Sequence, residues 1–187
     1  PIDKLIVATN ENDILHRAIS KGDYVSKEVK ETLSPSMDIQ LASNFERLIY
    51  YVNNSDSEKT TEIMKKVKQN SYQIEKNNLE IIQKDFLSES CNEQETLDII
   101  KKNYEENNII LDPHTAVGVG AANKLSFNDC VVLSTAHPCK FPDATNNAIN
   151  KHEKLPEELQ HVLDKEENFK VLKNNTEEVK NFVKSKV

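Results

Sequence analysis

The chain has 187 residues, enough for one ordinary domain or for a large piece of a bigger one. Hydrophobic residues make up 37% and charged residues 29%, which still permits a core because the apolar residues fall in clusters. The net charge of −7 argues against a nucleic-acid surface, which needs clustered lysine and arginine. No apolar run is long enough to cross a membrane, so we expect a soluble, cytoplasmic protein.

Cysteine and histidine give no sign of a metal site. The three cysteines, Cys91, Cys130 and Cys139, are widely spaced and form no C-x-x-C pair. Together with five histidines they provide no metal-ligand spacing, so no metal is expected. Free thiols fit a reducing compartment best.

The first predicted elements are a strand and a helix. Leu5–Ala8 is a continuous apolar run between polar residues, which is typical of a strand buried on both faces. In the polar segment that follows, Asn10 or Asn12 can cap a helix that ends at Gly22.

Two further elements complete the range 1–53, which we expect to form part of an α/β domain for cofactor and substrate. Val29–Leu33 is a candidate strand. Ser43–Glu46 fits a capping box, in which two side chains bond free amides reciprocally, and predicts a helix beginning there.

The range 54–108 changes character and is predicted to be a peripheral α+β insertion. Ser57–Asn70 and Asn92–Glu106 have the pattern of amphipathic helices with charged outer faces. Between them, Tyr72–Ile74 and Ile81–Phe86 are predicted to form a pair of strands.

The range 109–150 returns to alternating strands and helices. Ile109–Leu111 and Cys130–Leu133 are candidate buried strands. Asp112 can cap a helix whose first residue is proline, a position that tolerates the missing amide. Phe141–Ile149 is predicted to be a short helix.

The range 151–187 is expected to be a helical tail. Its candidate helices are Glu157–Asp164 and Thr176–Lys184, with a weak strand at Phe169–Leu172 between them.

Polar residues at the ends of the predicted strands are the candidates for chemistry, because open α/β sheets bind ligands at strand carboxyl ends. Ser134 and Thr135 present two hydroxyls after Cys130–Leu133; they either contact a ligand or cap the following turn. Asp112 is either a helix cap or a site residue, and His114 either faces the site or packs.

Further along, His137 is able to move protons near neutral pH, and Lys140 could pair with an anionic substrate. A turn histidine and a solvated lysine are the structural alternatives. Polar clusters nearer the amino terminus suit recognition of a phosphate. Capping and turn roles explain these residues equally well: Asn12, Ser36, Asn44 and Arg47.

Two segments carry a family resemblance. Leu111–Gly118 (LDPHTAVG) and Val131–Phe141 (VVLSTAHPCKF) closely resemble the carboxyl-terminal half of threonine synthase, of the longer fungal and bacterial type. Residues 1–50 are also similar to that family. The resemblance implies an α/β fold, the carboxyl-terminal part of a tryptophan synthase β-like (fold type II) pyridoxal-phosphate enzyme, with a mostly parallel sheet flanked by helices.

The resemblance also implies site roles. Thr135 would offer its hydroxyl to the pyridine nitrogen of pyridoxal 5′-phosphate, with Ser134 as the alternative if the alignment is one residue off. Asp112 and His114 would line the cofactor site. The Schiff-base lysine is expected upstream of Pro1, so this chain is expected to contain no catalytic lysine of its own.

The implied activity is that of a lyase in threonine biosynthesis, which converts O-phosphohomoserine and water to threonine and phosphate. The chain would then be a fragment, inactive without the missing amino-terminal half. The alternative is a non-catalytic remnant or ligand-binding module that keeps the fold. Removing half of such an enzyme should expose apolar surface or a strand edge, so we expect self-association.

Overall fold

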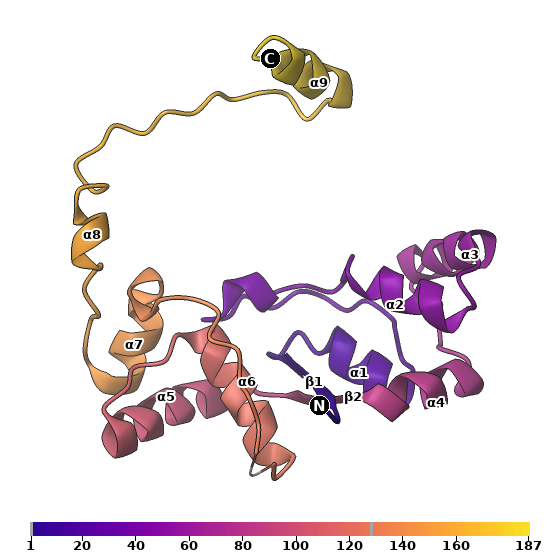
Figure 1. Ribbon diagram of the computed structural model, residues 1–187, viewed down its shortest axis with the longest axis horizontal. Coiled ribbons are helices and arrows are strands. Elements are labelled where there is room, and N and C mark those ends of the chain that lie inside the picture. The colour runs from indigo at the N-terminus through magenta and orange to yellow at the C-terminus, as the bar shows by residue number, and fades with distance from the viewer. Residues whose placement is uncertain (1, 128) are drawn as a thin grey trace. The chain divides into compact units, whose positions relative to one another are not determined.

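A computed structural model describes residues 2–127 and 129–187 (Figure 1). It separates into two compact units, one extending to Glu153 and the other covering Lys154–Val187. The first unit contains the sheet and the buried core. The division falls close to residue 151, where the sequence predicts that the helical tail begins.

Over the described residues, the sheet consists of two parallel strands, β1 (Leu5–Thr9) and β2 (Phe86–Ser90), paired from Leu5 with Phe86 to Thr9 with Ser90. β1 confirms the strand expected from its apolar run. β2 lies inside the range 54–108, so that part of the range belongs to the sheet and is not peripheral. A parallel pair with helices packed on it confirms the predicted α/β class.

Helices from both halves of the unit pack on these strands. α1 (Ile14–Lys21) and α6 (Pro113–Lys124) each contact β1 and β2, and α5 (Glu93–Asn107) packs against α6. α1 ends as predicted at Gly22, which has the left-handed φ of 76° that glycine adopts without strain. A Cβ on Gly120 would lie 2.7 Å from both Cys91 Sγ and Ile99 Cδ1, so glycine allows the close approach of α6.

In the part of the chain that the structure describes, two apolar clusters form the core. The larger one is centred on α1 and includes Tyr24, Ile49 and Ile82. It also involves α2 (Phe45–Val52), α3 (Ser57–Lys68) and α4 (Lys76–Asp85). The second cluster joins α5, α6 and α7 (Pro142–Ile149) through Ile100, Ala116 and Ala144. This second cluster supports the beginning of α6, where the predicted site lies.

Several predicted helices are confirmed with slightly different bounds: α1, α2, α3, α5, α6 and α7. In the tail, α9 (Thr176–Lys184) has the predicted bounds. The cap predicted for α1 at Asn10 or Asn12 is wrong, because Asp13 precedes this helix without a side-chain cap. The expected capping box at Ser43–Glu46 is wrong, because Asn44 precedes α2 without a side-chain cap. The box forms instead at α5, between Asn92 and Glu95. The helix predicted from Glu157 is shortened to α8 (Glu157–Gln160).

The prediction of strands at Tyr72–Ile74 and Ile81–Phe86 is wrong. Gln73 makes only an isolated antiparallel bridge to Asp23. The second segment is mostly α4, whose Ile82 is buried while Ile81 is 45% exposed. A helix buries about one position per turn, and here that position is Ile82. Because Ile81 and Ile82 are adjacent and both apolar, the sequence alone does not show which of them is buried.

The remaining predicted strands are also absent. Val29–Leu33, Ile109–Leu111, Cys130–Leu133 and Phe169–Leu172 have no strand assignment. Val131 and Leu133 are 89% and 76% exposed, so no neighbouring strand in the described part of the chain pairs with or covers them. In the first of these segments, backbone amides bond side chains instead: Lys30 N–H donates to Asn12 and Thr32 N–H to Asp38.

Candidate functional site

The first turn of α6 is built around the carboxylate of Asp112, which is 1% exposed. Asp112 Oδ1 accepts the backbone N–H of His114 at 3.0 Å and that of Thr115 at 3.4 Å. This is the predicted helix cap, and it satisfies amides that have no partner within the helix. Asp112 also accepts from the hydroxyl of Thr115 and approaches His114 Nδ1 at 3.0 Å.

His114 is buried and held at both ring nitrogens. Its Nε2 accepts the backbone N–H of Ser36 at 3.2 Å, so the proton of the neutral ring lies on Nδ1, facing Asp112. The ring also packs on Phe141, with centroids 4.6 Å apart. Of the two alternatives that the sequence leaves open, the geometry matches packing: His114 ties η1 (Pro35–Met37), Phe141 and the start of α6 together.

Thr135, the predicted cofactor contact, is joined to this turn through Thr115. Its backbone N–H donates to Thr115 Oγ1 at 3.1 Å, and the two hydroxyl oxygens lie 3.3 Å apart. Thr135 and Ser134 are both exposed. The buried end of α6 therefore supports an exposed pair of hydroxyls.

The segment that follows Thr135 returns to the same helix end. η2 (Pro138–Lys140) is preceded by His137, whose Nδ1 accepts the N–H of Cys139 at 3.2 Å. Lys140 is exposed, with its Nζ 5.9 Å from the centre of the Phe141 ring. Phe141 thus brings the loop of His137 and Lys140 to the end of α6 that holds His114.

A hydrogen-bonded network positions the loop that reaches His114. Asn10 Nδ2 donates to Asp38 at 2.7 Å and to Ser34 at 2.9 Å, while Asn12 Nδ2 donates to Asp38 at 3.0 Å. Asn12 is 1% exposed and also bonds both backbone groups of Lys30. Its contacts are those of a loop support, whereas the exposed Ser36 carries the amide that meets His114.

Asn44 and Arg47 form a separate pair. Arg47 donates to Asn44 Oδ1 at the start of α2, and both residues are exposed. α2 packs on α3 and α4 and lies away from α7 and the first turn of α6 (Figure 1). The structure does not bring this pair together with Thr135.

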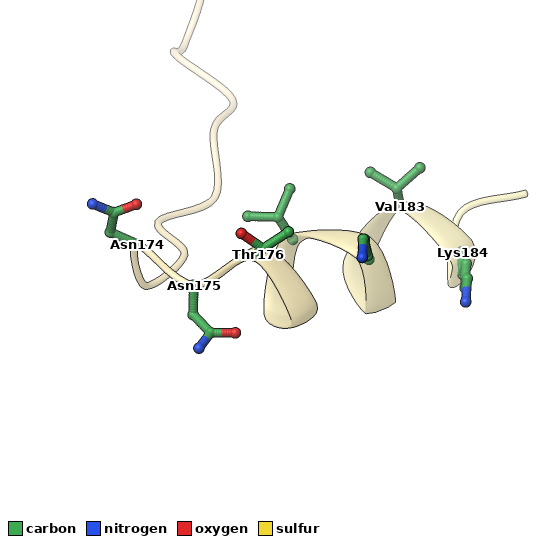
Figure 2. Close-up of a pocket in the computed structure, with 7 residues that line it drawn as sticks. Asn174, Asn175, Thr176, Val183 and Lys184 are labelled. Atoms are coloured by element: carbon green, nitrogen blue, oxygen red, sulfur yellow. The ribbon is translucent and has the colours of Figure 1, made fainter. Parts of the chain in front are cut away.

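The surface has a hollow beside His137 and another along α9. One, of about 330 Å³, is lined by His137, Pro138, Tyr104, Asn108, Ile110 and Glu153. A larger one, of about 450 Å³, lies along α9, and its lining side chains come from that helix and the two residues before it (Figure 2). Because its lining comes from one short helix and the two residues before it, no separate elements converge on this hollow, and it has no role in the site.

Thr115 and Phe141 are site residues that sequence reasoning missed. The sequence predicts Phe141 only as the start of a helix, and it places Thr115 only within a motif. Thr115 is the third residue of its helix, where a hydroxyl can reach the capping carboxylate, so the Asp-Pro-His-Thr order does contain a signal.

Within residues 2–127 and 129–187, no group of three or more His, Cys, Asp or Glu side chains is placed to hold a metal ion. Over the same residues, every helix is too short or too polar to span a bilayer.

Comparison with known proteins gives a consistent match. A family profile described as "Threonine synthase, C-terminal" matches residues 115–183. Threonine synthase of Saccharomyces cerevisiae is 41% identical over all of this chain, and that of Pseudomonas aeruginosa is 37% identical over 98% of it. This chain is similar to the carboxyl-terminal portion of threonine synthases. The predicted family resemblance is confirmed.

Solved threonine synthases share the fold. The chain aligns over 99% of its length with a threonine synthase from Brucella melitensis in its PLP-bound form, with a TM-score of 0.87 and 38% identity. The yeast threonine synthase gives a TM-score of 0.83 over 98% of the chain. The chain spans 42% of the S. cerevisiae relative and 40% of the P. aeruginosa one.

Proposed function

We propose that this chain forms the carboxyl-terminal portion of a protein that converts O-phosphohomoserine and water to threonine and phosphate. The observation that carries the proposal is the hydrogen-bonded pair of Thr115 and Thr135, which places an exposed hydroxyl beside a buried helix end. It lies in the stretch matched by the threonine synthase profile. The similarity to threonine synthases over the whole chain supports the same activity.

Pyridoxal 5′-phosphate is the proposed cofactor, and Thr135 is the residue proposed to contact its ring nitrogen. The donor set fits this part of the cofactor, because a pyridine nitrogen needs one hydrogen-bonding group and Thr135 offers an uncharged, exposed hydroxyl. Ser134, also exposed, stays the alternative contact. When bound, the cofactor supplies the electron-withdrawing ring on which elimination of phosphate depends.

The role we propose for Thr135 is electronic as well as positional. A neutral hydroxyl does not hold the ring nitrogen protonated as a carboxylate would, which favours elimination and replacement over transamination. Asp112 caps α6 next to Thr115, but its oxygens are occupied by its own helix turn. We therefore propose that Asp112 and His114 shape the cofactor wall without contacting the ring.

The residues proposed to contact the substrate are less closely grouped around Thr135 than those proposed for the cofactor. His137, Lys140 and Ser36 are exposed around the end of α6 and keep the role proposed from the sequence. Asn12 is buried and bonded to Lys30 and Asp38, which favours a supporting role. Asn44 and Arg47 would require the substrate phosphate to reach α2.

The proposed partner of the chain is an amino-terminal portion that supplies the lysine and the phosphate-binding loop. Exposed apolar residues of the first unit support this proposal, because side chains of this kind are normally covered: Ile109, Val131 and Leu133. Self-association of the isolated chain follows from the same surface. A cytoplasmic location is part of the proposal.

The test is phosphate release from O-phosphohomoserine by the full-length protein, with pyridoxal phosphate added, compared with residues 1–187 alone. We expect threonine and phosphate in equal amounts from the full-length protein and none from the isolated chain. A full-length protein that binds the cofactor without turning over substrate would support the non-catalytic alternative.

A further inference from the structure

The hydroxyl of Thr115 has a fixed hydrogen-bond direction. Thr115 is 5% exposed, and its Oγ1 donates to the carboxylate oxygen Asp112 Oδ2. An ionised carboxylate can only accept, so the single hydroxyl hydrogen of Thr115 is committed to Asp112. The lone pairs of Thr115 Oγ1 are consequently free to accept.

Those lone pairs face Thr135. Thr115 Oγ1 accepts the backbone N–H of Thr135 at 3.1 Å and lies 3.3 Å from its hydroxyl oxygen. Since Thr115 has no second hydrogen, Thr135 must be the donor in any bond between the two hydroxyls. A side chain buried in α6 thus holds both the backbone and the hydroxyl of an exposed residue twenty positions away.

The surroundings of Thr135 offer little other support. Residues 130–135 have no strand partner in the described part of the chain, and the flanking Leu133 and Ser134 are exposed. Among the same described residues, both hydrogen bonds of Thr135 go to Thr115 Oγ1. Asp112, which orients Thr115, is 1% exposed, and its carboxylate is held by four donors of its own turn.

We propose that Thr115, oriented by Asp112, is a positioning residue that sets where the Thr135 hydroxyl meets the cofactor ring. This rests on the proposed function, because it requires Thr135 to contact pyridoxal phosphate. In the cofactor-free protein the Thr135 hydroxyl donates towards Thr115. On binding it turns to the ring nitrogen, while its N–H stays on Thr115 and keeps the residue in place.

The first experiment uses the full-length protein without cofactor. Thr115→Val keeps the shape of the side chain and removes its hydroxyl, whereas Thr115→Ser keeps the hydroxyl. We expect hydrogen–deuterium exchange of the Thr135 amide to accelerate in Thr115→Val and to stay near the parent rate in Thr115→Ser. Equal exchange in all three proteins would overturn the proposal.

The second experiment measures cofactor affinity and the absorbance maximum of the bound cofactor in the same variants and in Thr135→Val. We expect about two- to tenfold weaker pyridoxal phosphate binding in Thr115→Val, the effect of one lost hydrogen bond, and recovery in Thr115→Ser. The absorbance shift should have the same sign as in Thr135→Val.

These variants distinguish the proposed ring contact of Thr135 from the proposed positioning role of Thr115. If Thr135→Val leaves the affinity and spectrum unchanged, the proposed ring contact is wrong. If Thr135→Val alters them and Thr115→Val does not, the contact stands and the positioning role is overturned. Should Thr115→Val fail to fold, Thr115→Ser and Thr115→Cys provide the comparison, since a thiol is a weaker acceptor in the same place.

Discussion

The first turn of α6 and the segment after Cys130 lie against each other but differ in what holds them. In the turn, Asp112, His114 and Thr115 are buried, and their polar side-chain groups are hydrogen-bonded. In the segment, Val131, Leu133 and the hydroxyl residues are exposed, without regular structure before η2. The contrast shows that the first turn of α6 has its hydrogen bonds and packing satisfied within this chain. The segment after Cys130 instead leaves apolar and hydroxyl side chains exposed.

Asp112→Ala should have the largest effect. It removes the helix cap, about 0.5–2 kcal/mol, and leaves buried donors on His114 and Thr115 unpaired, about 1–3 kcal/mol each. We expect a total loss of at least about 2.5 kcal/mol in the free energy of unfolding, measured by urea denaturation. Asp143→Ala is the control, because Asp143 is exposed in the first turn of α7. Equal losses in the two variants would show that the hydrogen bonds of the buried Asp112 carboxylate add no stability beyond that of an exposed helix-start aspartate.

Gly120→Ala tests how tightly the support is packed. The added methyl would lie 2.7 Å from Cys91 Sγ and from Ile99 Cδ1, so both neighbours must shift. We expect a loss of about 1–2 kcal/mol, after a gain of about 1 kcal/mol in helix propensity is included.

Gly118→Ala is the matched control in the same helix. Its methyl would lie 3.0 Å from Val132 Cγ1 alone, on the exposed-segment side. That segment has no strand partner in the described part of the chain, so we expect the midpoint of thermal unfolding to stay unchanged or to rise slightly. A larger loss of stability in Gly118→Ala than in Gly120→Ala would show that α6 packs more tightly against the segment after Cys130 than against Cys91 and Ile99, which contradicts the comparison.

The other end of α6 should respond to pH. The hydrogen bond from Lys124, helped by the N–H of Asn92, holds the pKa of Glu95 below its ordinary value of 4.5. Because the folded pKa is the lower one, this stabilisation is present above about pH 4.5 and is lost as the pH falls through the folded pKa. Both side chains are 36% exposed, so its size is about 0–1 kcal/mol.

Glu95→Gln keeps a residue that supports a capping box and removes the charge. We expect the free energy of unfolding to fall less steeply below about pH 4.5 than in the parent protein. An unchanged pH dependence would show that the pair contributes nothing.

Val131→Ser should have the smallest effect on the isolated chain. Its side chain is 89% exposed, so we expect a change within about 0.5 kcal/mol. The same substitution in the full-length protein should cost more, about 1–2 kcal/mol, if another part of that protein covers the segment. Equal effects in both contexts, measured by denaturation, would contradict a covered surface.

The sequence predicts some helix ends and misses others. The helix start at Asp112 before proline and the helix end at Gly22 are confirmed, because these capping interactions are local. The N-cap predicted at Asn10 or Asn12 and the capping box predicted at Ser43–Glu46 are wrong, because Asp13 and Asn44 stand at these helix ends without a side-chain cap. The strand predictions fail where tertiary pairing decides. Cys130–Leu133 has the composition of a buried strand, but composition does not tell whether a partner strand is present.

The candidate site could be predicted in part, for a similar reason. The Asp112 cap could be placed from the turn-helix pattern. Thr135 is singled out by the resemblance to threonine synthase, because the strand predicted before it is absent. The link between them could not be predicted, because the contact of Thr115 with Thr135 joins residues twenty positions apart. The support of His114 by the Ser36 amide joins still more distant segments, which no local pattern records.

The most direct test of the central claim is the affinity and absorbance of pyridoxal phosphate in the full-length protein carrying Thr135→Val, compared with Thr135→Ser. The account predicts weaker binding and a shifted absorbance maximum in Thr135→Val, with values near the parent in Thr135→Ser. Parent-like affinity and absorbance in Thr135→Val would contradict it.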